Sequence, residues 1–385
     1  MLTLNGGTAT TVTYSYTNDG SADDNQGTVD WDGATLTYTG LEPISSTITT
    51  TEVTLDYSAV SETITITDAG SGQTTVDSTA GEITTFTQPT GTLAINAGAG
   101  DDIVDIVGMA IGYPAHVTID GQDGMDTVSL DGTINLAPDK NLFVSADTIE
   151  VNSALSSSGT GYVSLNADRN IDMNSGSRIS TVNGDISLEA NAAGLVYGSF
   201  VGIDVDAATL TANGIGAITI SGRGGDTSSD DGVAIDESSL GTFNGTIRIT
   251  GHAGAGTSSS DGVDIGSDSA IESTGSGSIS LSGRSGSGSS SDGIEISDSS
   301  IRSISGAINI DGDASHADSS CDGVELDDSL VESASGAVQI TGDSQQAGSS
   351  SDGVDINDSA IRSATGYLQI TGTATGAGSR AEGVE

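Results

Sequence analysis

The stretch SSSDGVDINDSAIRSATG at residues 349–366 decides the fold, because the chain repeats it with small changes. Residues 319–336 read SSCDGVELDDSLVESASG, and residues 289–306 read SSSDGIEISDSSIRSISG. A nearly fixed period of about 30 residues is typical of a solenoid, in which each unit stacks on its neighbours. The aspartates of the recurring Asp-Gly pair are Asp231, Asp261, Asp292, Asp322 and Asp352.

The apolar residues of one copy have the spacing of β-strands. Val354 and Ile356 lie two positions apart, and so do Leu368 and Ile370. Gly, Ser, Thr and Asp are poor helix formers, whereas Val, Ile and Thr favour strands. The sequence therefore predicts an all-β fold, a parallel β-helix (β-solenoid) with about three short strands per coil. Equivalent aliphatic residues are expected to form columns, one of which comprises Val233, Val263, Ile294, Val324 and Val354.

The rhythm of the chain predicts three regions. Residues 1–90 alternate less regularly, and they are either a separate β domain or degenerate coils. Residues 91–214 follow a shorter period of roughly 23–24 residues, with Val163 recurring as Ile186. Residues 215–385 carry the longer coils described above, and the last copy is truncated, which favours a piece of a longer chain.

The composition restricts the possible partners. Fifty-four acidic residues against nine lysines and arginines give a formal net charge of −45. Nucleic acid and anionic membrane surfaces need basic patches on a protein, so divalent cations are the natural partners. The chain has no run of about twenty apolar residues, so we expect no transmembrane helix. Its single cysteine cannot form an internal disulfide.

Part of the repeat region resembles a known family. The run LNADRNIDMNSGSRISTVNGDISLEAN at 165–191 resembles the coils of filamentous-haemagglutinin-type bacterial adhesins. The segment NGTIRITGHAGAGTSSSDGVDI at 244–265 is similar to repeats of very large secreted bacterial surface proteins. The resemblance covers about residues 140–385. It implies a right-handed parallel β-helix, a location outside the cell or at the bacterial cell surface, and a role in adhesion or matrix building, but no catalytic residue.

Two segments predict a calcium site. AGAGDDIVD at 97–105 and GQDGMDTVS at 121–129 are similar to the glycine-rich nonapeptide of calcium-binding secreted proteins. A hard cation such as Ca²⁺ prefers oxygen ligands. If the offset between the two segments makes one coil, Asp102 would stack on Asp126. The alternative is that Gly-Asp turns simply join strands. The candidate ligands are Asp101, Asp102, Asp123 and Asp126.

The repeats predict a second cation site along their acidic columns. Like charges about 4.8 Å apart repel by about 1 kcal/mol per pair in water. Divalent cations bridging the coils would offset that repulsion. The alternative is turn chemistry, in which Asp-Gly adopts a positive φ, the carboxylate caps nearby N–H groups, and salt screens the charges. The candidate ligands are Asp261, Asp292, Asp322 and Asp352, and a parallel acidic column comprises Glu237, Asp268, Asp298, Asp328 and Asp358.

These observations favour a structural function. We expect the stalk or body of a secreted or cell-surface bacterial adhesin, which presents Gly/Ser/Asp-rich loops to an unknown cell-surface or matrix component. The alternatives are a Ca²⁺-binding biofilm or surface-layer matrix protein, and a polysaccharide lyase or hydrolase. We expect no enzyme, because every carboxylate has a counterpart in other repeats and because His116, His252 and His316 are isolated in the sequence. The presented loops are 251–260, 283–291, 312–321 and 342–351.

Overall fold

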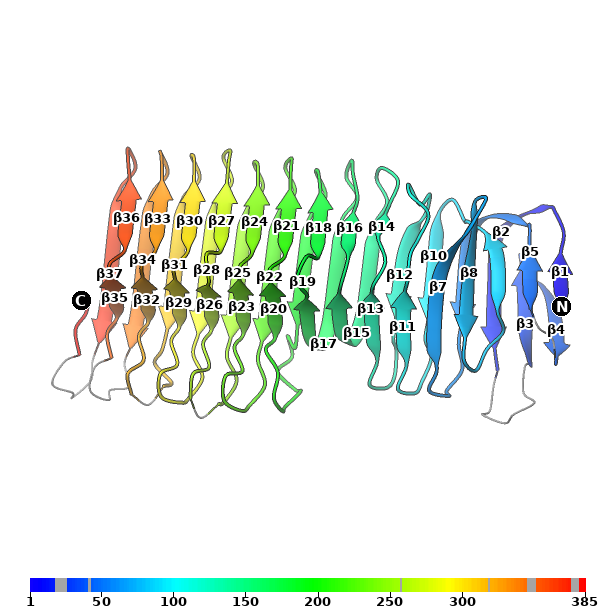
Figure 1. The fold of residues 1–385 in the computed structure, drawn as a ribbon, viewed down its shortest axis with the longest axis horizontal. Helices are drawn as coiled ribbons and strands as arrows, with labels where there is room; N and C mark the ends of the chain where they lie inside the picture. The colour runs from blue at the N-terminus through cyan, green and yellow to red at the C-terminus, as the bar shows by residue number, and fades with distance from the viewer. Residues whose placement is uncertain (18–25, 41–42, 257, 318, 345–350, 375–380) are drawn as a thin grey trace. The chain divides into compact units, whose positions relative to one another are not determined.

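The computed structural model describes residues 1–17, 26–40, 43–256, 258–317, 319–344, 351–374 and 381–385. The chain divides into two compact units, Met1–Ala167 and Asp168–Glu385. Every helix or strand assigned in the described ranges is a β-strand, which confirms the prediction of an all-β fold (Figure 1). A search of those ranges for a helix long and apolar enough to cross a membrane finds none.

The second unit contains three ladders of parallel strands, and each repeat adds one strand to each ladder. The first ladder comprises β20 (Ile203–Asp206), β23 (Val233–Asp236), β26 (Val263–Gly266), β29 (Ile294–Ser297), β32 (Val324–Asp327) and β35 (Val354–Asn357), and the end of β17 (Val163–Met173) pairs with β20. The second comprises β18 (Arg178–Thr181), β21 (Thr209–Ala212), β24 (Ser239–Thr242), β27 (Ala270–Ser273), β30 (Ser300–Ser303), β33 (Leu330–Ser333) and β36 (Ala360–Ser363). The third comprises β19 (Ile186–Ala190), β22 (Ile218–Arg223), β25 (Ile247–His252), β28 (Ile279–Arg284), β31 (Ile308–Asp313), β34 (Val338–Ser344) and β37 (Leu368–Ala374).

The register of these ladders places equivalent aliphatic residues side by side, as the sequence predicts. Val263 pairs with Val233 on one side and with Ile294 on the other. Ile301 lies in the same way between Ile271 and Val331. All of these side chains are buried, and the most exposed of them, Val331, is only 1% exposed. The aliphatic columns therefore form the core, and the arrangement is consistent with a β-solenoid.

The corner between the first and second ladders combines a left-handed residue with a buried serine. Asp298 has a φ of 49°, and its counterpart Asp328 has a φ of 46°. Aspartate tolerates this conformation better than most residues. The hydroxyl of the following Ser299 accepts a hydrogen bond from the backbone N–H of Ser269, with 3.1 Å between the two atoms. The second predicted acidic column, which is Glu237, Asp268, Asp298, Asp328 and Asp358, thus occupies a turn position in every repeat.

The glycine of the Asp-Gly pair has a different role from the predicted one. Gly262 does not have a positive φ, so the expectation of a positive-φ turn at this pair is wrong. Instead, a Cβ on Gly262 would overlap the backbone of Arg284, and a Cβ on Gly283 would overlap the carbonyl oxygen of Gly293. Two columns of glycine therefore pack against each other, and any side chain there would separate the first ladder from the third.

The first unit combines parallel ladders with antiparallel strands. Its parallel strands begin with β1 (Leu2–Leu4), β2 (Thr8–Tyr16), β5 (Ile44–Ser46), β6 (Thr49–Asp56), β7 (Thr63–Gly70) and β9 (Thr84–Thr87). They continue with β10 (Thr92–Asn96), β11 (Ile103–Ile106), β12 (His116–Asp120), β13 (Thr127–Leu130), β14 (Ile134–Asn135), β15 (Leu142–Val151) and β16 (Ala154–Ser156). The strands β3 (Gln26–Trp31), β4 (Ala34–Thr39) and β8 (Gln73–Ser78) pair antiparallel with their neighbours.

One apolar column runs through the parallel strands of this unit. Leu93 on β10 pairs with Val53 on β6, although the two residues are far apart in the sequence. On its other side, Leu93 pairs with Val117 on β12. All three side chains are buried. Residues 1–90 therefore contribute strands β2 and β6 to the same parallel ladder as β10 and β12. The antiparallel strands lie between these strands in the sequence but not in the ladder.

Candidate cation sites

The aspartates of the Asp-Gly pairs form a column at the start of the first ladder, and all of them except Asp231 are buried. The Oδ1 atom of Asp231 accepts a hydrogen bond from the backbone N–H of Asp261, at 2.7 Å. Asp261 and Asp292 accept the same bond from the next repeat, each at 2.5 Å, and Asp322 accepts it from the N–H of Asp352. Hydrogen bonds from backbone donors to a carboxylate stabilise its charged form. The capping part of the turn-chemistry hypothesis is therefore correct for this column.

Two glutamates complete groups of three carboxylates beside the column. Asp261, Asp292 and Glu295 place one oxygen each within 4.8 Å of one another. Asp292, Asp322 and Glu325 do the same, so Asp292 belongs to both groups. Glu295 lies on β29 and Glu325 on β32, and the two glutamates are paired in register.

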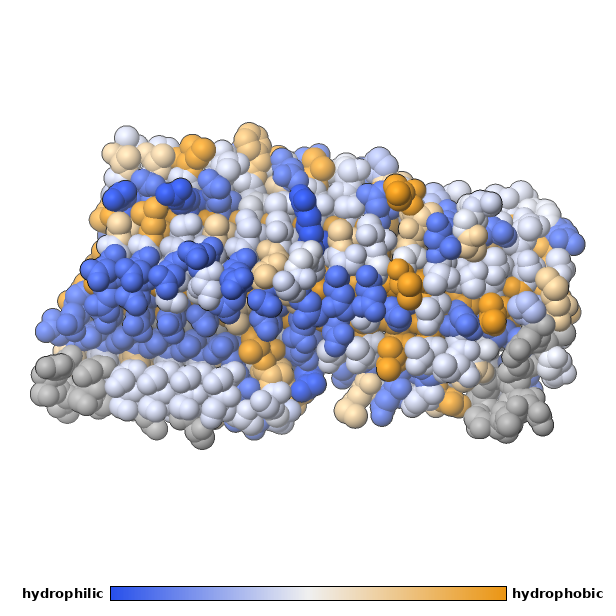
Figure 2. All heavy atoms as spheres, viewed as in Figure 1, coloured by the Kyte–Doolittle hydropathy of each residue, from blue (hydrophilic) through white to orange (hydrophobic). Residues whose placement is uncertain are grey.

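Of the four aspartates that the sequence singles out, three therefore belong to these groups. Asp352 belongs to no such group among the described residues. Neither glutamate is among the ligands predicted from the sequence. A signal existed, because the repeats read DGVD, DGIE and DGVE, with an acidic residue three positions after the aspartate. Figure 2 shows a continuous hydrophilic band on the face that carries β26, β29, β32 and β35.

Burial makes the charged form of these carboxylates unfavourable. Burial raises the pKa of Asp322 to about 7, and the neighbouring charges of Glu325 and Asp352 add to the effect. Burial and the charge of Glu295 raise the pKa of Glu325 to about 7 as well. The pKa of Asp292 also lies well above its usual value, first because of burial and then because of the charge of Asp261.

The described residues offer these groups no positive partner. The two salt bridges in that part of the chain join Arg284 to Asp313 and Arg302 to Glu332. Either protons or a cation must therefore offset the repulsion between the three carboxylates. Ca²⁺ binds oxygen at about 2.3–2.6 Å, so two ligand atoms of one ion lie at most about 5 Å apart. Oxygen atoms that all lie within 4.8 Å of one another meet that requirement, and a set of oxygen ligands alone suits a hard divalent cation.

The candidate site of the first unit is also partly as predicted. Asp102 lies beside Asp126, and its backbone N–H donates to Oδ1 of Asp126 at 2.9 Å. Oδ1 of Asp102 accepts from the N–H of Glu62 at 2.8 Å. The Oδ2 atoms of both aspartates are buried and have no hydrogen-bond partner within the described ranges. Burial raises the pKa of Asp126 to about 6.

The other two predicted ligands of the first unit lie at the surface. Asp101 is exposed, and its Oδ1 accepts a hydrogen bond from the N–H of Met125 at 3.0 Å. Asp123 is exposed as well, and its backbone bridges that of Ala99. In the described part of this unit, no three acidic, histidine or cysteine residues meet closely enough to share one ion. The three-carboxylate groups of the second unit are therefore the stronger candidates.

Comparison of the chain with models of protein families, with curated proteins and with solved structures finds no match.

The raised pKa values predict that the metal-free protein loses stability as pH rises. The pKa of Glu325 is about 7 in the folded chain, against 4.5 for an unperturbed glutamate. Between these values the folded state binds more protons than the unfolded state, so the free energy of unfolding falls with increasing pH. Below the unperturbed value this contribution is fully present, and it is lost as pH passes about 7. In a chelating buffer, the melting temperature should therefore be several degrees lower at about pH 8 than at about pH 5.

Repulsion among the many other carboxylates also lowers stability with pH, so a matched pair of variants isolates the effect of the site. Glu325→Gln should flatten the dependence. Glu272→Gln, which removes an exposed carboxylate on β27, should leave it as in the original chain. Equal slopes for both variants would contradict the assignment of the raised pKa to this group.

Proposed function

We propose that the chain is the structural body of a secreted or cell-surface bacterial adhesin, and that it presents loops to cells or to a matrix. The observation that carries the proposal is the in-register stacking of equivalent residues in all three ladders of the second unit. Because each repeat pairs with the next in the same way, the fold extends by adding repeats. Such a fold is suited to holding many similar loops at fixed spacing, which is what adhesion to an extended surface needs.

We further propose that the strands wind as a right-handed parallel β-helix. Each repeat leaves the first ladder, passes through the second and third, and returns to the first beside its starting strand. Crossover connections between parallel strands are right-handed in about 98% of cases. In this geometry the Gly/Ser loops between the third and first ladders form one edge. In three of the four predicted loops, 251–260, 312–321 and 342–351, the residues 257, 318 and 345–350 lie outside the described ranges.

The repetition also supports a non-catalytic role. A hydrolase or lyase needs one asymmetric set of groups, such as two carboxylates at a fixed separation. Here the arrangement of Asp261, Asp292 and Glu295 recurs one repeat later as Asp292, Asp322 and Glu325. An array of equivalent acidic groups suits ion binding better than it suits the cleavage of one bond.

Adhesion can be tested with beads coated with the chain. Coated beads should bind to layers of epithelial cells or to biofilm matrix more than uncoated beads do. A polyethylene glycol chain attached at Ser290→Cys, in the exposed loop edge, should abolish this binding. The same polymer at Ser305→Cys, an exposed residue at the corner that follows β30, is the matched control and should preserve it.

Two results would overturn the adhesive function. One is that coated beads bind no better than uncoated ones. The other is that the polymer at Ser305 is as harmful as the polymer at Ser290, which would show that the loop edge is not the contact surface.

The three-carboxylate groups favour a second candidate, a Ca²⁺-loaded matrix component that needs no specific receptor. Dissociation constants of extracellular Ca²⁺ modules are about 10⁻⁴–10⁻³ M, so Ca²⁺ at about 10 mM should add about 1–3 kcal/mol to the free energy of unfolding. The measurement is a melting curve with and without Ca²⁺. Asp292→Asn, which affects both groups, should remove most of the gain, whereas Glu272→Gln should keep it. No gain in the original chain would exclude this candidate.

A further inference from the structure

Four of the few basic and histidine side chains of this acidic protein converge at one place. The chain has only nine lysines and arginines and three histidines. Arg223, His252 and Arg284 end strands β22, β25 and β28, and the register pairs Arg223 with His252 and His252 with Arg284. Neighbouring strands lie about 4.8 Å apart. The prediction that His252 and His316 are isolated is therefore wrong for both residues, because His316 lies against Arg284.

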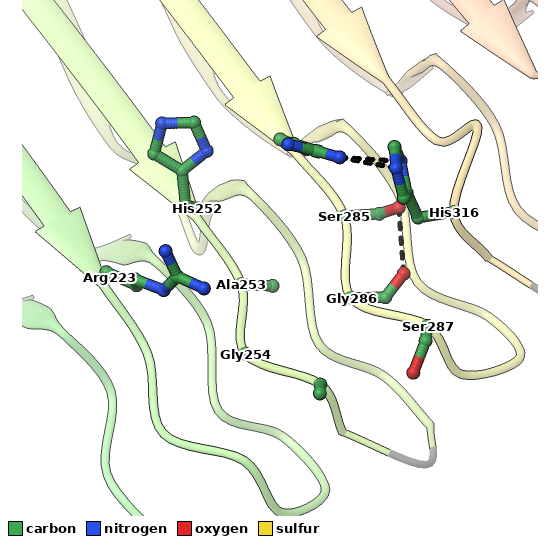
Figure 3. Close-up of a pocket in the computed structure, with 10 residues that line it drawn as sticks. Arg223, His252, Ala253, Gly254, Ser285, Gly286, Ser287 and His316 are labelled. Atoms are coloured by element: carbon green, nitrogen blue, oxygen red, sulfur yellow. Dashed lines mark hydrogen bonds between the residues drawn. The ribbon is translucent and has the colours of Figure 1, made fainter. Parts of the chain in front are cut away.

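These side chains line a cavity of about 210 Å³ (Figure 3). Arg223 and His252 stand on adjacent strands, and His316 comes from the loop that follows β31. The glycine-rich segments Ala253–Ala255 and Ser285–Ser287 form the rest of the lining. A second cavity, of about 240 Å³, shares Arg223, His252 and Arg284 with the first. The row formed by Arg223, His252 and Arg284 therefore borders both cavities.

The positive charge of this row is poorly neutralised. Among the described residues, the guanidinium of Arg223 has no hydrogen-bond or salt-bridge partner. Nε of Arg284 is 3.9 Å from Oδ2 of Asp313, which is near the limit of a salt bridge, and the two side chains are 45% and 43% exposed. Nη2 of Arg284 also lies 3.1 Å from Nδ1 of His316, so the ring nitrogen accepts a hydrogen bond from an already positive group.

The pKa of His252, which lies between the two arginines, responds to this excess of positive charge. Partial burial lowers the pKa of His252, and the charges of Arg223 and Arg284 lower it further, against an opposing effect of Asp313. Like charges directly opposite each other on neighbouring strands destabilise a sheet. A negatively charged group placed between these side chains would relieve the repulsion and would be held by hydrogen bonds to charged donors.

The surroundings restrict which anion can bind. The net charge of −45 repels an extended polyanion, so a ligand with one negative group is favoured. The two cavities are each smaller than the roughly 300–1,000 Å³ typical of sites for drug-sized molecules, which suits a ligand of about one sugar ring. Tyr197, which is 70% exposed, lines an adjoining hollow together with Arg223.

We propose that this pocket binds a terminal acidic sugar, whose single carboxylate is held by Arg223, His252 and Arg284. The pocket lies at the base of loops 251–260, 283–291 and 312–321. The inference thus rests on the proposed adhesive function, in which these loops make the contact, and it gives that contact a chemical partner.

Binding should depend on pH through His252. Its facing charged groups are Arg223 on β22, Arg284 on β28 and Asp313 on β31. A bound carboxylate favours the protonated imidazole and so opposes the lowering of the pKa of His252, and the sugar should therefore bind more tightly as pH falls from neutral into the acidic range.

Calorimetric titration of the full chain with glucuronate tests the proposal. Glucuronate should bind in the millimolar range or more tightly, and glucose, which has the same ring without the carboxylate, should not bind. Arg223→Gln and Arg284→Gln should each weaken binding at least tenfold. Arg362→Gln is the matched control, since it removes an exposed arginine on β36, a strand of another ladder. Lowering the pH from about 7.5 to about 5.5 should strengthen binding severalfold.

Several results would overturn the inference. They are equal binding of glucose, inorganic sulfate that binds as tightly as glucuronate, and Arg362→Gln that is as harmful as Arg223→Gln. All four side chains of the pocket are exposed, so the variants should keep the melting temperature of the original chain.

The titration also separates this inference from the adhesive function. A chain that binds glucuronate but does not adhere would contradict the adhesive function alone, and a chain that adheres without binding glucuronate would contradict the pocket alone.

Discussion

The structure depends on one constraint, which is that equivalent residues of successive repeats lie side by side in parallel ladders about 4.8 Å apart. Residues of the same type therefore lie next to one another, and each type must be stable beside a copy of itself. Ile301 between Ile271 and Val331 satisfies this by burial of apolar surface. The serines at the corner satisfy it by hydrogen bonds from one backbone to the next hydroxyl. The glycines satisfy it by leaving no side chain between two backbones.

This constraint is unfavourable for carboxylates, because their negative charges repel one another. In both units, hydrogen bonds from backbone N–H groups stabilise the stacked carboxylates. In the second unit, the carboxylate of Asp261 accepts the N–H of Asp292, one repeat later in the sequence. In the first unit, the carboxylate of Asp126 accepts the N–H of Asp102, which is earlier in the sequence. Each of these hydrogen bonds provides a donor for one oxygen of a carboxylate. The remaining oxygens, together with Glu295 and Glu325, are what a proton or a divalent cation must neutralise.

Structural features that all repeats share can be predicted from the sequence, whereas features that differ between repeats are missed. The columns that contain Val263 and Ile301 follow from the two-residue alternation and the fixed period of the repeats. The glycine contacts do not, because the Asp-Gly pair indicates a local turn, whereas the actual neighbour of Gly262 is the backbone of Arg284. The pocket was missed because the column that contains His252 reads Arg, His, Arg, Asp, Asp and Thr, so its repeats are not equivalent. Aligning the strand ends SGR, TGH and SGR would have revealed it.

Spin labels on the outer face of β30, β33 and β36 test the in-register stacking most directly. Arg302, Glu332 and Arg362 are paired in register on these strands. Cys321 can be replaced by serine, which the equivalent positions 291 and 351 carry. Nitroxides at Arg302→Cys and Glu332→Cys, one repeat apart, should show strong dipolar broadening, and nitroxides at Arg302→Cys and Arg362→Cys should show much weaker broadening. Absent or equal broadening in the two pairs would contradict the stacking and the functions inferred from it.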